Sequence, residues 1–394
     1  MNRRHFLQSL AALGTPLAGT INGVAWAAPQ VATQANNSPY NNLLILIELK
    51  GANDGLNSVI PYADPAYVSL RPRLAIARDQ VLQLSAREGL HPALNPLMAL
   101  WNEKELAVVQ GLGYPNANLS HFRSIEIWDT ASKSDEYLES GWLARTFAAA
   151  PAPRQFAADG VVVGSSDMGP MSGAGARTIA LADTAQFLRN AKLANPNADQ
   201  RNAALKHILA VEQEIVHAAS KLNTNYLFKT EFAKSAFGNQ VRTAAQLVAS
   251  QAGMACIRLT LGGFDTHANQ LGTHANLLKE LAEGIATLKS ALVELNRWNE
   301  TLVMTYAEFG RRPKENQSSG TDHGTAAAHF VAGGRVRGGL YGAAPELNRI
   351  DGNGNLAFAV DFRSMYATVI DNWWRGDSTK VLGARHPTIE FVRT

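Results

Sequence analysis

Three short motifs in the sequence combine carboxylate and imidazole side chains of the kind that bind metal ions. They are Asn53-Asp54-Gly55, Asp265-Thr266-His267 and Asp322-His323. Each follows or precedes a short apolar run that indicates a strand, so we expect all three at the carboxyl edge of one sheet, where open α/β folds bind ligands. Carboxylates and imidazoles together suit a divalent cation such as zinc, manganese or calcium. The motifs therefore predict a metal site.

The two later motifs support each other. Alone, Asp265-Thr266-His267 is typical of a local hydrogen-bonded turn. The adjacent pair Asp322-His323 favours metal binding, because it could serve two ions, or one ion and a substrate, as in two-metal hydrolases.

A second group of reactive side chains begins at Ser120 and precedes an expected helix over residues 125–131. Ser120 fits an N-cap. It also fits a nucleophile at a helix N-terminus, where amide groups bind a phosphate or sulfate, and Ser124 is the alternative nucleophile. His121 is a candidate metal ligand or proton donor, and Arg123 a candidate partner for an oxyanion.

A third group follows the expected strand at 302–306. Arg311 and Arg312 suit a tetrahedral anion, and Glu308 would orient one of them or bind metal; a structural Glu-Arg pair explains the same residues. The glycine-rich segment 333–339 lacks the ending of a phosphate-binding loop, and we expect a flexible connection beside the site. His329, placed in an expected helix, and the C-terminal His386 are candidates for a further ligand.

Continuous apolar runs separated by helical patterns predict an α/β fold with a mostly parallel central sheet flanked by helices. The expected strands are 43–49, 106–109, 161–163, 257–261 and 302–306. The expected helices are 274–298, 199–222 and 229–251, the last two forming a helical segment beside the sheet at about 199–251. Residues 42–394 are expected to form a single domain.

The amino terminus predicts export. Asn2-Arg3-Arg4-His5-Phe6 begins a twin-arginine signal, followed by a mildly apolar stretch and a small-residue cleavage pattern ending at Ala27. We expect a signal peptide over 1–27, a flexible lead-in over 28–41, passage through the twin-arginine translocase, and a periplasmic or extracellular protein. The stretch is shorter than the ~20 apolar residues of a membrane span, so no stable span is expected.

The composition is typical of a globular protein and predicts no basic surface for binding nucleic acid. The chain has 394 residues, is 46% hydrophobic and carries a formal charge of +3, which falls by two when Arg3 and Arg4 are removed with the signal. Nucleic-acid binding is therefore not expected. The single cysteine, Cys256, lies in an apolar run, so we expect a buried strand residue rather than a nucleophile.

The order of these motifs resembles one family. The chain has a Gly-Ala-Asn-Asp-Gly-Leu-Asn strand end, then Ser-His-Phe, Phe-Asp-Thr-His, Glu-Phe-Gly-Arg and Thr-Asp-His-Gly, which resembles the exported family called domain of unknown function 1501 (DUF1501). That family is similar to the alkaline phosphatase and sulfatase superfamily. The resemblance implies Asp54 as the first metal carboxylate, Asp265 and His267 as one later ligand set, and Asp322 and His323 as the other.

The resemblance implies a function as well as a fold. We expect a metal-dependent hydrolase of phosphate or sulfate esters acting on a small-molecule or polymer ester. Ser120 or metal-activated water would attack, and Arg123 or Arg311 would neutralise charge. The sulfatase Cys-x-Pro-x-Arg motif is absent from the sequence, which excludes formylglycine chemistry. The alternative is a non-catalytic structural or partner-binding protein on the same scaffold.

Overall fold

The computed structural model describes residues 38–181, 220–222 and 226–393, and its centre is a nine-stranded sheet. The strands run in the order β13-β5-β12-β9-β1-β8-β6-β7, and β14 pairs with β5. Strands β1, β9, β8, β6 and β7 are mutually parallel, whereas β12 runs antiparallel to both β5 and β9. The mostly parallel α/β architecture is confirmed.

The strands of this sheet are β1 (Leu43–Lys50), β5 (Leu106–Gly113), β6 (Gly160–Val163), β7 (Thr178–Leu181), β8 (Cys256–Gly262), β9 (Thr301–Tyr306), β12 (Ala327–Ala332), β13 (Gly339–Gly342) and β14 (Val360–Asp361). Two small sheets stand apart from it, formed by β2 (Val59–Ile60), β3 (Leu82–Gln83) and β4 (Gly89–Leu90), and by β10 (Arg311–Glu315) and β11 (Thr321–His323). The five strands expected from apolar runs are all present.

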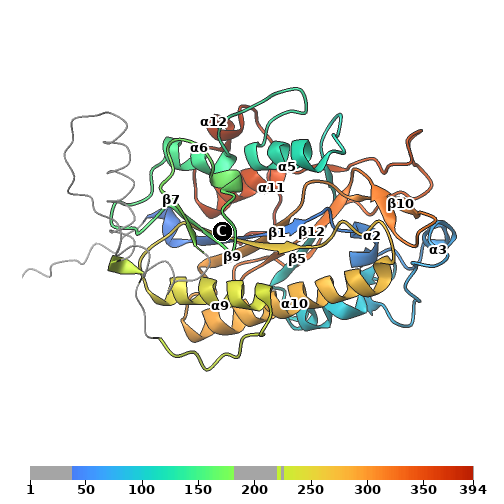
Figure 1. Cartoon of the computed structure of the whole chain (residues 1–394), viewed down its shortest axis with the longest axis horizontal. Helices are drawn as coiled ribbons and strands as arrows, with labels where there is room; N and C mark the ends of the chain where they lie inside the picture. Colours follow the sequence, from blue (N-terminus) through green and yellow to red (C-terminus); the bar gives the residue numbers. More distant parts are fainter. Residues whose placement is uncertain (1–37, 182–219, 223–225, 394) are drawn as a thin grey trace, which may run out of the picture. The chain divides into compact units, whose positions relative to one another are not determined.

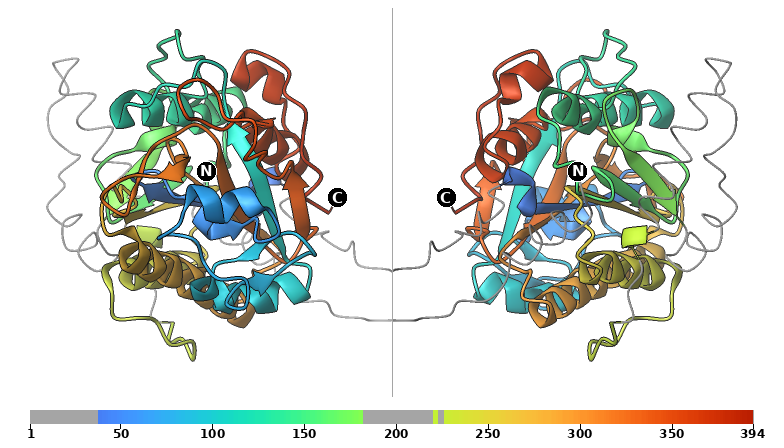
Figure 2. Two further views of the ribbon diagram at one scale, coloured as in Figure 1. Left: turned by 90° about the vertical axis from the view of Figure 1, so that its right-hand side faces the viewer. Right: turned by 90° about the vertical axis from the view of Figure 1, so that its left-hand side faces the viewer.

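Helices cover both faces of the sheet (Figure 1). One face carries α5 (His121–Thr130), α6 (Trp142–Ala149), α11 (Arg363–Thr368) and α12 (Ser378–Leu382); the other carries α9 (Ala236–Ala249) and α10 (Gln270–Glu294). Shorter helical elements are α2 (Gly55–Ser58), α3 (Pro65–Leu70), α4 (Met98–Asn102), the 3-10 turns Pro39–Asn41, Pro92–Leu97 and Gly169–Met171, and the π turn Val369–Trp373. Viewed along its length, the sheet lies between the two helical layers (Figure 2).

Burial on both faces of the sheet explains why the central strands are continuous apolar runs in the sequence. In β1, Ile45 and Ile47 pack in the core that includes α9 and α10, while Leu44 and Leu46 pack in the core on the opposite face. Successive strand residues point to opposite faces, so a strand covered on both sides must be apolar throughout. Cys256 is fully buried in β8, as expected.

Several expected boundaries were wrong. The fold begins at Ser38, not Asn42, because Tyr40 is buried and packs edge-on against Phe147. In the expected helix 229–251, α9 covers only Ala236–Ala249. The glycine-rich segment 333–339 does not border the strand ends that carry the motifs: Gly333 donates to the carbonyl of Glu105, at the start of β5. The signal peptide, most of the lead-in and residues 199–219 lie outside the described residues.

Within the described ranges, we find no helix whose length and apolar character would let it span a bilayer.

A buried polar layer crosses the sheet beneath α5. Arg258 on β8 donates to Glu48 on β1 (2.8 Å) and to the hydroxyl of Tyr306 on β9 (2.8 Å), and Tyr306 lies 3.4 Å from Asp129 of α5. Burial raises the pKa of Glu48 and raises that of Asp129 well above its usual range, although Arg258 opposes both shifts. One guanidinium therefore neutralises a layer that joins three strands and a helix.

Replacing Arg258 with Met should lower the free energy of unfolding by about 3–5 kcal/mol, because a buried carboxyl layer loses its cation. Urea denaturation at neutral pH measures the change. Arg349→Met is the matched control, since Arg349 pairs with Glu346 at an exposed site, and it should alter stability by less than about 0.5 kcal/mol. Equal stability of the two variants would show that the layer does not depend on Arg258.

Candidate metal centre

The motifs meet at the carboxyl edge of the sheet. Asp265 follows β8 and Glu308 follows β9, while His121 begins α5, the helix after β5. His323 ends β11, in the small hairpin beyond the sheet. Because β5, β9, β1 and β8 point the same way, the segments that follow them share one end of the molecule, the end that also carries α2 and α3 (Figure 2, left).

Two glycines allow the loops of this end to touch. Gly51, with φ +109°, lies where a Cβ atom would come within 2.5 Å of the backbone nitrogen of Asp265. At Gly320 a Cβ atom would come within 2.2 Å of the carbonyl carbon of His267. Both approaches exclude a side chain, so the chain uses glycine at each position.

His121, Asp265 and His323 form a group that could hold a metal ion. One ligand atom from each lies within 4.8 Å of the others. The Nε2 atom of His121 is 3.4 Å from Asp265 Oδ2, and the Nε2 atom of His323 is 3.3 Å from Asp265 Oδ1. These three side chains come from three separate segments of the sequence: the start of α5, the loop after β8 and the hairpin strand β11.

His267 borders this group. Its Nε2 atom lies 3.0 Å from both Asp265 Oδ1 and His323 Nε2. Asp322 lies further out: its Oδ1 atom is 3.6 Å from His267 Nδ1 and accepts a hydrogen bond from Asn316. Asp322 is thus placed to orient His267, at the outer side of the group.

Hydrogen bonds to the far ring nitrogens orient two of the imidazoles. His323 Nδ1 lies 2.8 Å from the carbonyl oxygen of Leu119. A carbonyl only accepts, so Nδ1 carries the proton and, in the neutral ring, Nε2 presents a lone pair to Asp265. His121 Nδ1 lies 2.7 Å from the buried carboxylate of Glu308, which favours the same tautomer. Metal-binding histidines are held in this way.

Glu308 joins His121 to the loop after β1. Its Oε1 atom also accepts a hydrogen bond from the backbone of Gly51 (3.0 Å). The sequence predicted that Glu308 would orient an arginine or bind metal; the side chain it orients is instead an imidazole. The His121 Nε2 atom is buried and has no hydrogen-bond partner in the described part of the chain, so its lone pair is free for a ligand.

Arg311 is fully buried and holds the loops of the site together. Its guanidinium donates to the backbone carbonyls of Gly51 (2.5 Å), Ala52 (2.9 Å), Phe264 (3.3 Å) and Thr321 (3.0 Å) and to the carboxylate of Asp265. The remaining contact is to His267 Nε2 at 3.5 Å. The predicted role of neutralising a substrate anion is therefore replaced by a positioning role, because the donors of Arg311 are already engaged.

Arg311 also sets the charge of the site. Partial burial would raise the pKa of Asp265, but its hydrogen bond to Arg311 and the charge of that residue hold this pKa below its usual range. Burial lowers the pKa of His323, and the nearby guanidinium lowers it further, against the opposing hydrogen bond to Leu119. At neutral pH the site thus presents an ionised carboxylate beside a neutral imidazole.

The two serines differ in their surroundings. Ser120 is exposed at the N-cap of α5, between Leu119 and His121, and its side chain makes no capping hydrogen bond. Ser124 is buried, and its hydroxyl donates to the carbonyl of Glu308 while contacting the hydroxyl of Tyr114. Ser124 is therefore a structural residue, and Ser120 is the serine whose hydroxyl is accessible near the site.

Arg123 turns away from the metal-binding group. Its guanidinium donates to the carbonyls of Ser134 (3.1 Å) and Glu136 (2.5 Å) and stacks over the ring of Tyr137. Arg123 thus fastens the loop after α5, and the structure does not place it where it could pair with an oxyanion at the site.

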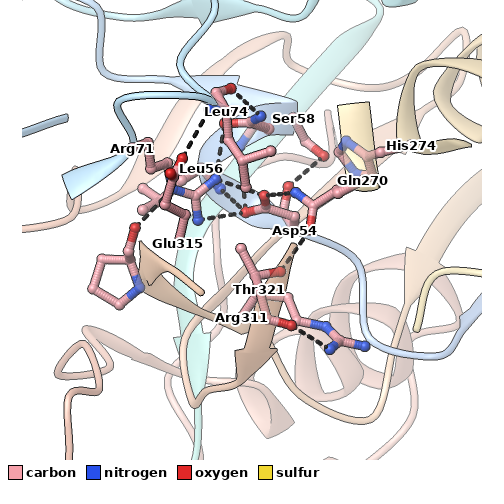
Figure 3. Close-up of polar contacts among 12 residues, drawn as sticks. Asp54, Leu56, Ser58, Arg71, Leu74, Gln270, His274, Arg311, Glu315 and Thr321 are labelled. Atoms are coloured by element: carbon pink, nitrogen blue, oxygen red, sulfur yellow. Dashed lines mark hydrogen bonds and ion pairs between the residues drawn. The ribbon is translucent and has the colours of Figure 1, made fainter. Parts of the chain in front are cut away.

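Asp54 lies in a buried network that reaches Arg311 only through Gln270 and Thr321 (Figure 3). Its carboxylate forms a two-point ion pair with Arg71 (2.6 and 3.0 Å), accepts from Gln270 (2.5 Å) and caps α2. It is not part of the His121, Asp265 and His323 group. Arg71 and Gln270 were missed by the sequence reasoning, since neither residue stands in a motif. The sequence-based role of Asp54 as a first metal carboxylate conflicts with these contacts, which leave it no free lone pair toward the site.

The two further candidate ligands also lie elsewhere. His329 is fully buried in β12, not in a helix, and burial lowers its pKa to about 3. His386 lies near Asp361 and Arg363. Neither belongs to the group formed by the described histidines and carboxylates at the strand ends.

A family model described as "Protein of unknown function (DUF1501)" matches residues 82–382, well over half of the chain. The chain belongs to this family. The expectation drawn from the motif order is thereby confirmed. No curated protein matches the chain.

Solved structures that resemble this DUF1501 protein include members of the alkaline phosphatase superfamily. A protein of that superfamily from Vibrio parahaemolyticus matches with a TM-score of 0.40 and 10% identity, over 87% of this chain and 69% of the other. The C-terminal periplasmic domain of EcEptC from Escherichia coli, solved in complex with Zn, matches at 0.38 and 10%, over 76% and 75%. The alkaline phosphatase from the Antarctic bacterium TAB5 matches at 0.33 and 12%, over 77% and 94%. Because these TM-scores lie below 0.5, a function must be argued from the site itself.

Asp54→Asn should destabilise the protein by about 3–5 kcal/mol at neutral pH, because it leaves Arg71 buried and unpaired. Although burial alone would raise the pKa of Asp54, Arg71 and Gln270 hold it below its ordinary value of 3.8. The folded-state pKa is the lower one, so this stabilisation is present above about pH 4 and is lost as the pH falls. Urea denaturation at neutral and acid pH should therefore show the difference between variant and wild type narrowing in acid.

The same variant tests whether Asp54 is a metal ligand. We expect Asp54→Asn to keep any divalent metal that the wild type binds, as measured by elemental analysis of the folded protein. If Asp54→Asn were as stable as the wild type but had lost the metal, Asp54 would again be a candidate metal ligand.

Proposed function

We propose that this DUF1501 protein is an exported, metal-dependent hydrolase of phosphate or sulfate esters. The observation that carries the proposal is the convergence of His121, Asp265 and His323 at the strand ends. Carboxylate and imidazole together are the ligands that zinc and similar divalent ions accept. Export through the twin-arginine route, proposed from the amino-terminal motif, is consistent with a protein that leaves the cytoplasm folded and loaded with metal.

The hydrogen bonds of the histidine ring nitrogens favour a bound cation at this site. With their Nδ1 protons held by Glu308 and by the Leu119 carbonyl, His121 and His323 each turn an Nε2 lone pair toward an oxygen of Asp265, at 3.4 and 3.3 Å. A lone pair that faces a carboxylate oxygen at that distance is repelled, and a cation between them would turn the repulsion into attraction. A metal ion held by His121, Asp265 and His323 would remove this repulsion and satisfy the unpartnered His121 Nε2 atom.

Each residue then has a defined part in hydrolysis. A divalent ion bound there would act as a Lewis acid on the ester oxygens. Glu308 and the Leu119 carbonyl fix the two imidazoles, and Arg311 fixes Asp265. Ser120 is the proposed nucleophile, with water as the alternative, since its hydroxyl is exposed beside His121. The free amides at the start of α5 favour an anion at the same position.

One observation favours the non-catalytic alternative. The guanidinium of Arg311 already supplies a positive charge to Asp265, so the carboxylate is compensated without a metal ion. On this alternative the protein is an exported structural or partner-binding protein, and its histidines serve the loop packing alone.

Metal analysis decides between the two functions. Protein purified without chelator should contain a near-stoichiometric divalent metal, and His323→Ala and Asp265→Ala should lose it. His386→Ala is the control imidazole outside the group and should retain the wild-type content. Asp322→Ala should largely keep the metal, because Asp322 contacts only His267, which borders the group without belonging to it. Absence of metal from the wild type after loading with zinc, manganese or calcium would favour the non-catalytic protein.

Glu308→Gln tests the imidazole orientation directly. The amide can still accept from Gly51, but it no longer holds the His121 ring by charge, so we expect metal affinity and hydrolysis of aryl phosphate or aryl sulfate to fall about 10–100-fold. Activity is measured with and without added metal, and excess metal should restore part of it in this variant. A Glu308→Gln protein with unchanged affinity and rate would remove Glu308 from the site.

A further inference from the structure

A large pocket opens beside the metal-binding group. Its volume is about 1170 Å³, and Leu119, whose carbonyl holds His323, forms part of its wall. Arg312, the neighbour of Arg311, forms another part. The volume exceeds the roughly 300–1,000 Å³ of common small-molecule sites. The pocket therefore has room for a ligand of more than one ring, and Leu119 and Arg312 connect its wall to the metal-binding group.

The charged residues of the pocket wall balance one another. They are two arginines, Arg312 and Arg349, and two acids, Glu346 and Asp351, with no lysine among the described lining residues. A site for a polyanion such as nucleic acid would carry an excess of positive charge. The wall of this pocket instead suits a ligand whose main body is uncharged.

The polar groups of the wall are suited to hydroxyl groups. Four primary amides line the pocket: Gln110, Asn116, Asn353 and Asn355. Each amide offers both donors and an acceptor, so it can pair with a hydroxyl in either role. Between them lie small apolar residues at 326–328, 343–344 and 357, which leave space for the C–H face of a sugar ring.

Unused hydrogen-bonding capacity lies in the same wall. The Nε atom of Arg312 is buried and has no hydrogen-bond partner among the described residues. Asn355 is 4% exposed, and its Oδ1 atom likewise lacks a partner in that part of the chain. Buried polar atoms are nearly always paired with protein, water or ligand. A donor and an acceptor without partners therefore belong to two residues that line the same pocket.

The loop that carries Asn355 is preformed by its own hydrogen bonds. The carboxylate of Asp351 accepts from the backbone nitrogens of Asn353 (2.9 Å) and Asn355 (2.8 Å), and Gly354 takes φ +83° between them. These hydrogen bonds hold the pKa of Asp351 below its usual range. Such a preformed turn lowers the ordering cost of binding a ligand.

We propose that this pocket is a binding site for the uncharged, polyhydroxylated body of a saccharide. The saccharide would extend from the metal-binding group, so that an anionic ester on one of its sugars lies at His121 and His323. That placement of the ester rests on the proposed function, whereas recognition of a neutral saccharide by the pocket does not.

Binding of neutral glycans by the purified protein tests the proposal without any need for metal or turnover. The probes are an array of neutral di- and oligosaccharides, with inorganic phosphate and a single-stranded oligonucleotide as comparison ligands. We expect at least one class of neutral glycan to bind, with chelator present as well as absent. Failure of every neutral glycan to bind, or preference for the oligonucleotide, would overturn the pocket assignment.

Two variants locate the binding. Arg312→Lys keeps the charge and the backbone but loses the fork of donors, so we expect affinity for the best glycan to fall about tenfold. Arg337→Lys is the matched control outside the pocket, where the exposed Arg337 already pairs with Glu390, and should bind within about twofold of the wild type. Asn355→Ala, checked for folding by its thermal melt, should also weaken binding. Unchanged affinity in both Arg312→Lys and a folded Asn355→Ala would place the glycan elsewhere.

The outcome separates this proposal from the proposed hydrolase. Glycan binding by a protein that takes up no metal under any loading condition and hydrolyses no aryl ester would support the pocket and refute only the ester chemistry. Metal binding and aryl-ester hydrolysis without any glycan binding would support the hydrolase and overturn the saccharide site.

Discussion

The guanidinium of Arg311 binds the loop after β1, the loop after β8 and the strand β11 at the same time. It is fully buried, and its partners are four backbone carbonyls and the carboxylate of Asp265. Without it, the carbonyls of Gly51, Ala52 and Thr321 would lose their arginine donor inside the protein, at a cost of about 1–3 kcal/mol for each one left unpaired, whereas the Phe264 carbonyl would keep its hydrogen bond from Thr266. The loops can approach closely only because one planar cation pairs with all of them. The positions of Asp265 and, through β11, of His323 therefore depend on this one side chain.

Carboxylates near this end of the sheet differ in how completely an arginine pairs with their two oxygens. Asp54 is saturated by Arg71, and Glu48 is paired with Arg258 inside the sheet. Asp265 differs because only one of its oxygens meets Arg311; the other faces His121 at 3.4 Å. The fully buried pairs stabilise the scaffold, whereas the half-exposed carboxylate keeps an oxygen for a ligand. The distinction follows from burial and geometry, since all three residues are acids close to a strand end.

Much of the fold could be predicted from the sequence, because the central strands are covered on both faces and so consist of continuous apolar runs. The antiparallel β12 was missed: Ala326, Ala327 and Ala328 have high helix propensity, but pairing with β5 and β9 overrides it. The hairpin of β10 and β11 was missed because its strands are short and polar. In each case the strand is defined by its neighbours in space, which local sequence does not reveal.

The candidate site was predicted in part, and for a physical reason. His121, Asp265 and His323 were found because imidazole and carboxylate groups placed beside apolar strands are uncommon enough to be noticed. The sequence could not distinguish Asp54 from Asp265, because the distinction depends on Arg71 and Gln270, which are remote in sequence and ordinary in type. Glu308 was noticed, but its partner was not, since 187 residues separate it from His121.

Anomalous diffraction from crystals grown with zinc would test the central claim most directly. We expect one ion within about 2.0–2.2 Å of the Nε2 atoms of His121 and His323 and of an Asp265 oxygen, with Arg311 still bound to the surrounding carbonyls. An ion bound elsewhere, or no ion at all with the imidazoles and Asp265 hydrogen-bonded to one another, would contradict the assignment of a metal centre to these residues.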